Sequence, residues 1–296
     1  MSHSPQRLIK YIHAHEAVIA NEYWYGDRPP LMHPSLSARK TGERRADVVD
    51  LLEKAANKSK DTGDRDQSRL LRRLANKIDR CRAGDRCGSL ACPECARAFQ
   101  RAKADAQKRV FLASAPKPAD GNSDPAKTLV MVTVIPLNLH YSPAALAHLD
   151  IAKRTRWFKD VLTETGLAQM MVGSADISWE HRHNEDYYQL HWHLAMWTKN
   201  PQKLQKRLLR VFPPKNKYDR PVEVTKSRSL NFLPYINKAI KLPDLLRRNR
   251  QHLPQLLLAL NRTAPLDLMV IKGLRLSAQS GRLALRPFGQ GEHGAN

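Results

Sequence analysis

Apolar residues before position 80 recur at the spacing of a helix, on an otherwise polar background. They are Val48, Leu51, Leu52, Ala55, Leu70, Leu71, Leu74 and Ile78. Residues three or four apart share one side of a helix, so each half of this set predicts an amphipathic helix. A polar segment at residues 58–66 separates the halves like a loop. We therefore predict a polar, mostly helical region over residues 1–80.

Residues 126–244 alternate between β-rich and helical patterns. The expected strands cover residues 128–139, 170–180, 188–197 and 222–225, and the expected helices cover residues 142–165, 200–209 and 230–242. The second and third strands flank the polar loop 181–186, which predicts a hairpin. This order of elements is typical of an α+β domain, with a central antiparallel sheet and helices packed on it.

Two other segments complete the predicted organisation. Residues 116–125 are rich in Pro, Asp, Gly and Asn, which indicates an exposed linker and a domain boundary. Before this linker, residues 81–115 hold four cysteines followed by a basic helix. At the other end, residues 245–296 are first Leu-rich and basic and then polar with several glycines. We interpret this last segment as a helical appendage and a loose tail.

Charge and composition narrow the class of protein. The chain of 296 residues has 50 Lys and Arg against 28 Asp and Glu, a formal charge of +22. Its 42% of hydrophobic residues is enough for a buried core and excludes a disordered tail protein. No apolar run reaches membrane-span length, and the N-terminus lacks a signal-peptide core. We expect a cytoplasmic protein, not bound to membrane, whose partner is nucleic acid.

His191 and His193 are the first candidates for chemistry. They lie two positions apart on an expected strand, so their side chains share one face, while the apolar residues between and beside them face the core. Two adjacent imidazoles suit a divalent metal ion. The alternative is a pair of incidental polar residues on a solvated face.

A carboxylate would complete a three-ligand metal site. Glu180, at the end of the preceding strand, is the predicted ligand because the hairpin returns the chain beside it. Asp176 and Ser178 share the face of Glu180, which makes that face polar throughout. The loop histidines His181 and His183 are expected to be solvated.

Tyr235 and Lys238 are three residues apart on the expected helix and therefore neighbours on one face. A tyrosine with its ordinary pKa of about 10 is a poor nucleophile. A close ammonium favours the phenolate, and a metal ion can activate a phosphate instead. Lys241, three residues after Lys238, continues this basic side of the helix and is predicted to bind DNA. Tyr218, in a basic loop, is a rival nucleophile, and a plain surface tyrosine on a basic helix is the other alternative for Tyr235.

The only four cysteines of the chain, Cys81, Cys87, Cys92 and Cys95, fall within one short segment. Disulfides are disfavoured in the cytosol, so four clustered thiolates predict a structural Zn²⁺ ion with all four as ligands. Redox-active or unliganded cysteines are the alternative.

The helix after the cysteines is strongly basic. Its cations are Arg97, Arg101, Lys103, Lys108 and Arg109. We expect it to bind DNA phosphates with the zinc module orienting it, or else to be a solvated charge run. No Gly-x-x-x-x-Gly-Lys-Ser/Thr loop is present, so unwinding of a duplex would need a partner.

A carboxylate-bearing strand, a His-hydrophobic-His strand and a downstream Tyr-x-x-Lys helix occur in this order. The chain thereby resembles the HUH endonucleases, specifically the rolling-circle replication initiators of bacterial plasmids and phages, over about residues 128–244. The cysteine segment is similar to the N-terminal part of some of these plasmid proteins. The resemblance implies a ferredoxin-like palm, and Mg²⁺ or Mn²⁺ held by His191 and His193. Tyr235 would be the DNA nucleophile, with Lys238 offsetting negative charge.

This resemblance implies a nickase and strand transferase that forms a 5′-phosphotyrosine and frees a 3′-hydroxyl. Its substrate would be single-stranded or extruded origin DNA, and a host helicase and DNA polymerase would be its partners. Family members often carry two Tyr-x-x-Lys units in tandem, whereas Ala239 stands at the second tyrosine position here. A conjugative relaxase, a transposase with the same chemistry and a non-catalytic zinc-containing DNA-binding protein are the alternatives.

Overall fold

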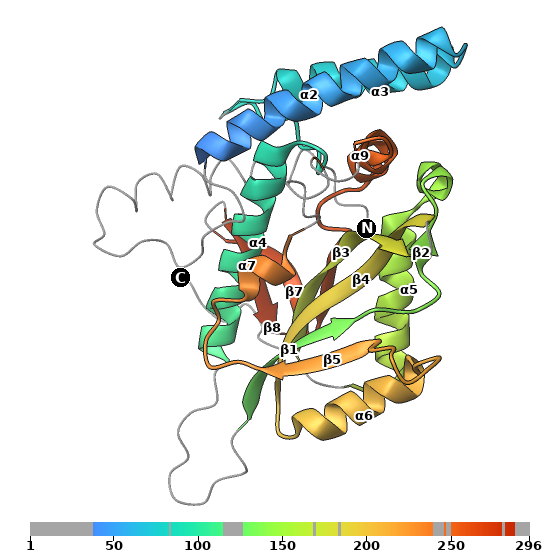
Figure 1. The fold of residues 1–296 in the computed structure, drawn as a ribbon. Helices are drawn as coiled ribbons and strands as arrows, with labels where there is room; N and C mark the ends of the chain where they lie inside the picture. Colours follow the sequence, from blue (N-terminus) through green and yellow to red (C-terminus); the bar gives the residue numbers. More distant parts are fainter. Residues whose placement is uncertain are drawn as a thin grey trace, which may run out of the picture.

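The computed structural model has an antiparallel β-sheet at its centre with helices against both faces (Figure 1). This confirms the predicted α+β class, in which a helical and cysteine-bearing region precedes the sheet in the sequence. The structure describes residues 38–82, 84–114, 127–167, 170–182, 185–238, 246, 250–279 and 282–287. The predicted linker at 116–125 lies outside these residues, as do His183, Ala239 and Lys241.

Six antiparallel strands form the central sheet, in the order β5-β1-β4-β3-β6, with β2 also paired to β4. They are β1 (Thr128–Val134), β2 (His140–Tyr141), β3 (Met171–Arg182), β4 (Glu185–Thr198), β5 (Val222–Lys226) and β6 (Met269–Lys272). The longest strands, β3 and β4, form the predicted hairpin. Strand β1 ends earlier than predicted because Pro136 cannot donate to a sheet ladder.

The described helices surround the sheet, and some of them cover its two faces. They are α2 (Ala38–Asp61), α3 (Arg65–Asp79), α4 (Pro93–Ala113), the 3-10 helix η1 (Ala144–His148), α5 (Ile151–Glu164), α6 (Pro201–Val211), α7 (Leu233–Ile236) and α9 (Leu253–Arg262). On one face, Phe158 of α5 stacks on Trp192 of β4 with ring centroids 4.2 Å apart. On the other face, Phe111 of α4 and Leu233 of α7 share an apolar cluster with Ala195 of β4.

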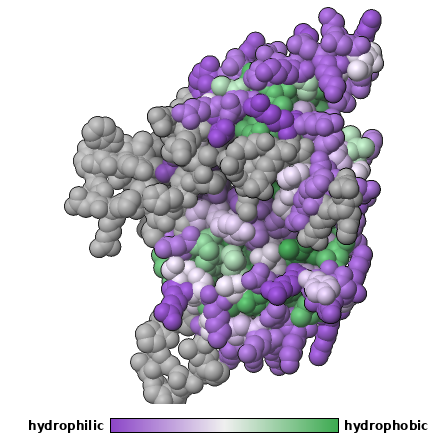
Figure 2. Space-filling model, viewed as in Figure 1, coloured by the Kyte–Doolittle hydropathy of each residue, from purple (hydrophilic) through white to green (hydrophobic). Residues whose placement is uncertain are grey.

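The helical N-terminal prediction is confirmed for the described part, where α2 and α3 form an antiparallel pair. Gly63 makes the turn with φ +86°, a conformation that residues with a Cβ rarely adopt. Asp64 then caps α3 by accepting a hydrogen bond from Gln67 N. Hydrophilic residues cover most of the outer surface of this pair, with apolar residues between the helices (Figure 2).

Two predicted helices differ in the structure. The single helix expected at 142–165 divides into η1 and α5, because Asp150 accepts a hydrogen bond from Lys153 N and starts a new helix. The helix expected at 230–242 is much shorter among the described residues, where α7 has only four residues.

The C-terminal segment also differs from the expected appendage and loose tail. Its helix α9 is present, but β6 pairs with β3 at the edge of the central sheet, and β7 (Leu274–Gln279) and β8 (Arg282–Pro287) form a hairpin. A four-residue apolar run does not reveal by its own pattern that it is a strand. Within the described residues, no helix has both the length and the apolar character that crossing a membrane requires.

Candidate metal centres and nucleophile

The two histidines lie on β4, the strand that pairs with β1 on one side and with β3 on the other. Trp192 between them is fully buried towards α5. His191 and His193 therefore point to the opposite face, with ring centroids 4.8 Å apart. This confirms the predicted alternation along the strand.

Strand pairing supplies a carboxylate to the histidines. Asp176 of β3 is the register partner of His191. Its Oδ2 atom lies 3.2 Å from His191 Nε2 and 3.5 Å from His193 Nε2. Glu180, the predicted ligand, is instead the partner of Tyr187, further along the hairpin, and is not among the residues that meet here. The structure therefore groups Asp176, and not Glu180, with the histidines.

The far sides of both imidazoles are held by hydrogen bonds. His191 Nδ1 lies 3.2 Å from the Gln189 carbonyl oxygen, and His193 Nδ1 lies 3.0 Å from Thr133 Oγ1. A carbonyl oxygen only accepts, so His191 carries a proton on Nδ1, and its Nε2 atom faces Asp176. Outer contacts of this kind orient metal-binding histidines.

The Asp176 group fits a divalent cation. The three ligand atoms lie within 4.8 Å of one another, and Asp176 Oδ1 is buried without a hydrogen-bond partner. Two imidazoles and one carboxylate are a donor set that binds divalent metals. Burial alone would raise the pKa of Asp176. The charge of His191, the hydrogen bonds of His191 and His193, and the charge of Lys238 outweigh burial and hold this pKa well below its usual range, so the group is a carboxylate.

Tyr235 and Lys238 complete the group from α7 and the residues after it. The Tyr235 ring lies 4.8 Å from the His193 ring, and the side chain is 41% exposed. Lys238 is buried, with Nζ 2.6 Å from Asp176 Oδ2 and 3.6 Å from the centre of the Tyr235 ring. The structure thus brings together four predicted residues, Tyr235, Lys238 and the two histidines.

Lys103 of α4 is a buried cation beside the site, 2% exposed. Its Nζ atom donates to Ser174 Oγ at 3.3 Å, and Ser174 is the register partner of His193. Burial lowers the pKa of Lys103 to about 7, although the charge of Asp176 acts to raise it. By sequence alone, Lys103 falls among the other cations of this helix. Its position on the same helix side as Phe99 and Ala106 was the available signal of burial.

The four cysteines also meet, as predicted. Cys81 Sγ lies 3.5 Å and Cys87 Sγ 3.6 Å from Cys95 Sγ, and all four sulfurs lie within 4.8 Å of one another. A tetrahedron with metal–sulfur bonds of about 2.3 Å places its sulfurs about 3.8 Å apart, close to these distances. Hydrogen bonds among the thiols lower the pKa of Cys81 and raise the pKa values of Cys92 and Cys95. The cluster therefore fits a closed four-thiolate metal site, and none of the four forms a disulfide.

Ion pairs join this cysteine cluster to the α2–α3 pair. Glu94, in the first turn of α4, lies 3.1 Å from Arg45 of α2 and 2.5 Å from Arg86 of the cysteine segment. Arg45 also donates to the Cys81 carbonyl oxygen. The cluster is thus anchored to helices on both sides of it in the sequence.

Helix α4 is not an exposed basic helix. It packs against α2, α7 and β8, and its predicted DNA-binding residues Arg97, Arg101, Lys108 and Arg109 are only partly exposed. Arg109 is paired with Asp105 on the same helix.

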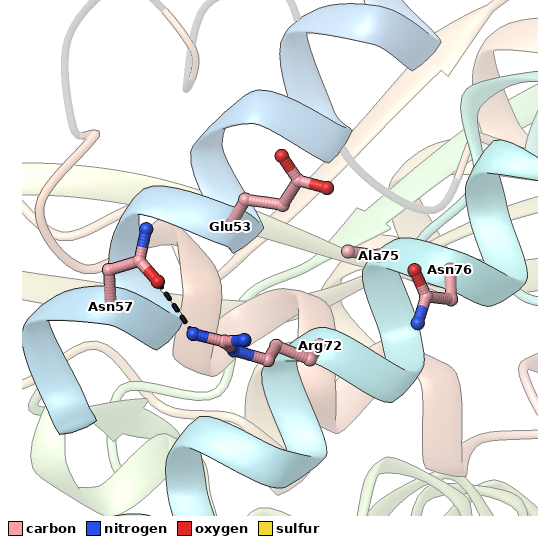
Figure 3. Close-up of a pocket in the computed structure, with 5 residues that line it drawn as sticks. All are labelled: Glu53, Asn57, Arg72, Ala75 and Asn76. Atoms are coloured by element: carbon pink, nitrogen blue, oxygen red, sulfur yellow. Dashed lines mark hydrogen bonds between the residues drawn. The ribbon is translucent and has the colours of Figure 1, made fainter.

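A row of exposed cations lies on α3 instead. They are Arg65, Arg69, Arg72, Arg73, Lys77 and the C-cap residue Arg80. Three of them, Arg73, Lys77 and Arg80, line a groove of about 420 Å³ that reaches Cys87. Arg72 faces a second pocket, between α2 and α3, where it donates to Asn57 Oδ1 at 2.7 Å (Figure 3).

Tyr218 and His181, the other sequence candidates, lie outside the group formed by Asp176, His191 and His193. Tyr218 is 80% exposed in the loop before β5, with Lys217 Nζ 5.0 Å from its ring centre. His181 is exposed on the hairpin and lies 2.8 Å from Asp186.

No protein-family model, curated protein or solved structure matches the chain. The geometry of the two clusters is therefore the basis for a functional proposal.

Proposed function

We propose that this protein is a metal-dependent DNA nickase of the HUH type that initiates rolling-circle replication. The observation that carries the proposal is the position of Tyr235, partly exposed with its ring 4.8 Å from the His193 ring. A nucleophile at the edge of a two-histidine, one-carboxylate group is an arrangement that suits tyrosine-dependent cleavage of a phosphodiester. In this proposal the central sheet is the palm of that family.

Asp176, His191 and His193 would hold Mg²⁺ or Mn²⁺, which when bound polarises the scissile phosphate as a Lewis acid. The Tyr235 oxygen forms a bond to phosphorus while the bond from phosphorus to the 3′ oxygen breaks. The phenol proton passes to solvent, and the departing oxygen takes a proton from solvent to become a 3′-hydroxyl. Lys238, with its ammonium over the Tyr235 ring, stabilises the phenolate during attack.

The surface charge supports a polyanionic partner. The exposed cations of α3 lie on one short helix, and the groove that Arg73, Lys77 and Arg80 line is concave and basic. Clustered cations bind DNA through its phosphates with an affinity that falls as salt is added. The ion in the adjacent cysteine cluster is Zn²⁺ in this proposal, because four thiolates are a common structural zinc site.

The test is cleavage of the DNA that flanks the gene, offered as supercoiled plasmid and as single strands with Mn²⁺. We expect a nick whose 5′ end stays attached to the protein. Tyr235→Phe should abolish this product, whereas Tyr218→Phe, the matched control, should retain it. Cleavage that persists in Tyr235→Phe and disappears in Tyr218→Phe contradicts the assigned nucleophile.

One observation favours a second candidate, a non-catalytic, zinc-containing DNA-binding protein. Lys238 Nζ lies 2.6 Å from Asp176 Oδ2, so the carboxylate already has a buried counter-charge. Mn²⁺ binding followed by electron paramagnetic resonance separates the two functions. The nickase requires Mn²⁺ binding that is lost in the His191→Ala, His193→Ala double variant. Wild-type protein that binds DNA but no Mn²⁺ supports the second candidate.

A further inference from the structure

A stripe of polar side chains on α4 faces the interior of the protein. Gln100, Lys103 and Gln107 lie on one side of the helix, and all three are buried. A buried amide or ammonium is costly unless a partner satisfies it. The partners of these residues therefore indicate what the stripe does.

The two glutamines bind the segment that carries Tyr235, one on each side of it. Gln100 Nε2 donates to the Pro234 carbonyl oxygen at 2.7 Å. Gln107 and Asn237 exchange two hydrogen bonds, from Gln107 Nε2 to Asn237 Oδ1 at 3.0 Å and from Asn237 Nδ2 to Gln107 Oε1 at 2.6 Å. Asn237 Nδ2 also lies 2.8 Å from the Leu233 carbonyl oxygen.

Lys103 lies between the glutamines and contacts the sheet, because its Nζ atom donates to Ser174 Oγ at 3.3 Å. Ser174 is two residues from Asp176 on β3. One helix therefore contacts both the tyrosine segment and the strand that supplies the carboxylate. Its side-chain lengths set the spacing between them.

The tyrosine segment has little structure of its own to hold it. Helix α7 has four residues, and helices this short are unstable in isolation. Leu233 and Ile236 anchor it by apolar contacts, which are non-directional. Hydrogen bonds on both sides of Tyr235 supply the direction and fix the register of the segment.

We propose that Gln100 and Gln107 are positioning residues that hold the Tyr235 segment above the Asp176, His191 and His193 group. The effect on cleavage rests on the proposed nickase function. The effect on the placement of the segment is independent of that function. A nucleophile without a fixed position loses the rate advantage of a fixed attacking geometry. The chemical step therefore slows, whereas the affinity for DNA stays the same.

The structural test is hydrogen exchange at residues 233–238, followed by mass spectrometry, in Gln107→Ala. We expect exchange there to be at least tenfold faster than in the wild type. Leu112→Ala, at a 58% exposed position on the same helix, is the matched control and should exchange like the wild type. Asn237→Ala should speed exchange at least as much, because it also removes the hydrogen bond to the Leu233 carbonyl oxygen. The double variant should be no worse than Asn237→Ala, because without Asn237 the hydrogen-bonded partner of Gln107 is already gone.

Gln100→Met keeps the side-chain length and removes only the hydrogen bond to Pro234, so it serves if Gln107→Ala does not fold. A folded Gln107→Ala or Gln100→Met variant that exchanges like the wild type at 233–238 overturns the proposal.

The catalytic test uses cleavage of single-stranded flanking DNA with Mn²⁺. We expect kcat to fall at least tenfold in Gln107→Ala, with KM within twofold of the wild type. A variant with raised KM and unchanged kcat overturns the positioning role. If the wild-type protein does not cleave DNA at all, the nickase function fails, and the exchange result alone still decides whether the glutamines hold the segment.

Discussion

The buried amine of Lys103 predicts a specific pH dependence of stability. Its pKa lies at about 7 in the folded protein, against 10.5 for an ordinary lysine, because burial disfavours the charged form more than the nearby Asp176 favours it. Between these two values the unfolded chain binds more protons than the folded one. The free energy of unfolding therefore rises with pH from about 7 to about 10.5, and below pH 7 the gain is absent.

The size of this effect follows from the two pKa values of Lys103. At about 1.4 kcal/mol for each pH unit, the difference between 10.5 and about 7 gives an upper limit of about 5 kcal/mol. Of this, about 3 kcal/mol falls between pH 6 and pH 9.

Lys103→Met removes the titrating group while keeping a long side chain. We expect Lys103→Met to be more stable than the wild type at pH 6, and this advantage to shrink by up to about 3 kcal/mol at pH 9. Urea unfolding of both zinc-loaded proteins at several pH values measures the difference, in which titrations common to both proteins cancel. If the two proteins show parallel profiles, Lys103 is not a buried amine with a lowered pKa.

Three further perturbations test other parts of the structure. Cys95→Ser should no longer retain one Zn²⁺ per chain by elemental analysis and should unfold at lower urea, whereas full zinc content would contradict the four-thiolate site. In Gly173→Ala the new Cβ would lie 2.1 Å from the His193 carbonyl oxygen, so we expect a loss of about 3 kcal/mol in urea unfolding, and a variant of wild-type stability would refute the β3–β4 register. DNA affinity falls as salt is added, and replacing Arg73 and Arg80 by Ala should make the slope of log affinity against log salt less negative by about 2. An unchanged slope would show that these two residues of α3 do not contact DNA.

The sequence predicted the histidine face correctly because alternation along a strand is a local property. His191 and His193 share a face in any strand, and the apolar residues around them decide which face is buried. The carboxylate that lies beside the histidines could not be predicted from a local pattern. The described hairpin strands extend to Arg182 and from Glu185, so residue 176, and not residue 180, comes opposite His191. Register depends on the turn and on both strands together, and a shift of four residues leaves the polar face unchanged.

The surroundings of α4 could not be predicted from its own sequence. Its cations suggested a surface for DNA, but Gln100 and Gln107 are buried by partners about 130 residues away in the chain. Such contacts arise only when the sheet brings α7 against α4. The same applies to β6. Its apolar run becomes a strand because it pairs with the edge of β3, which is distant in the sequence. Periodicity identifies which side of an element is apolar, and it does not identify the partner.

We propose that Tyr235 attacks DNA beside the Asp176, His191 and His193 group. Peptide mass spectrometry of the protein, after reaction with Mn²⁺ and single-stranded flanking DNA, identifies the residue that is modified. We expect a nucleotide linked through phosphate to the peptide that contains Tyr235, and no such adduct in the His191→Ala, His193→Ala variant. An adduct on Tyr218, or DNA cleavage that leaves every tyrosine unmodified, would contradict this assignment.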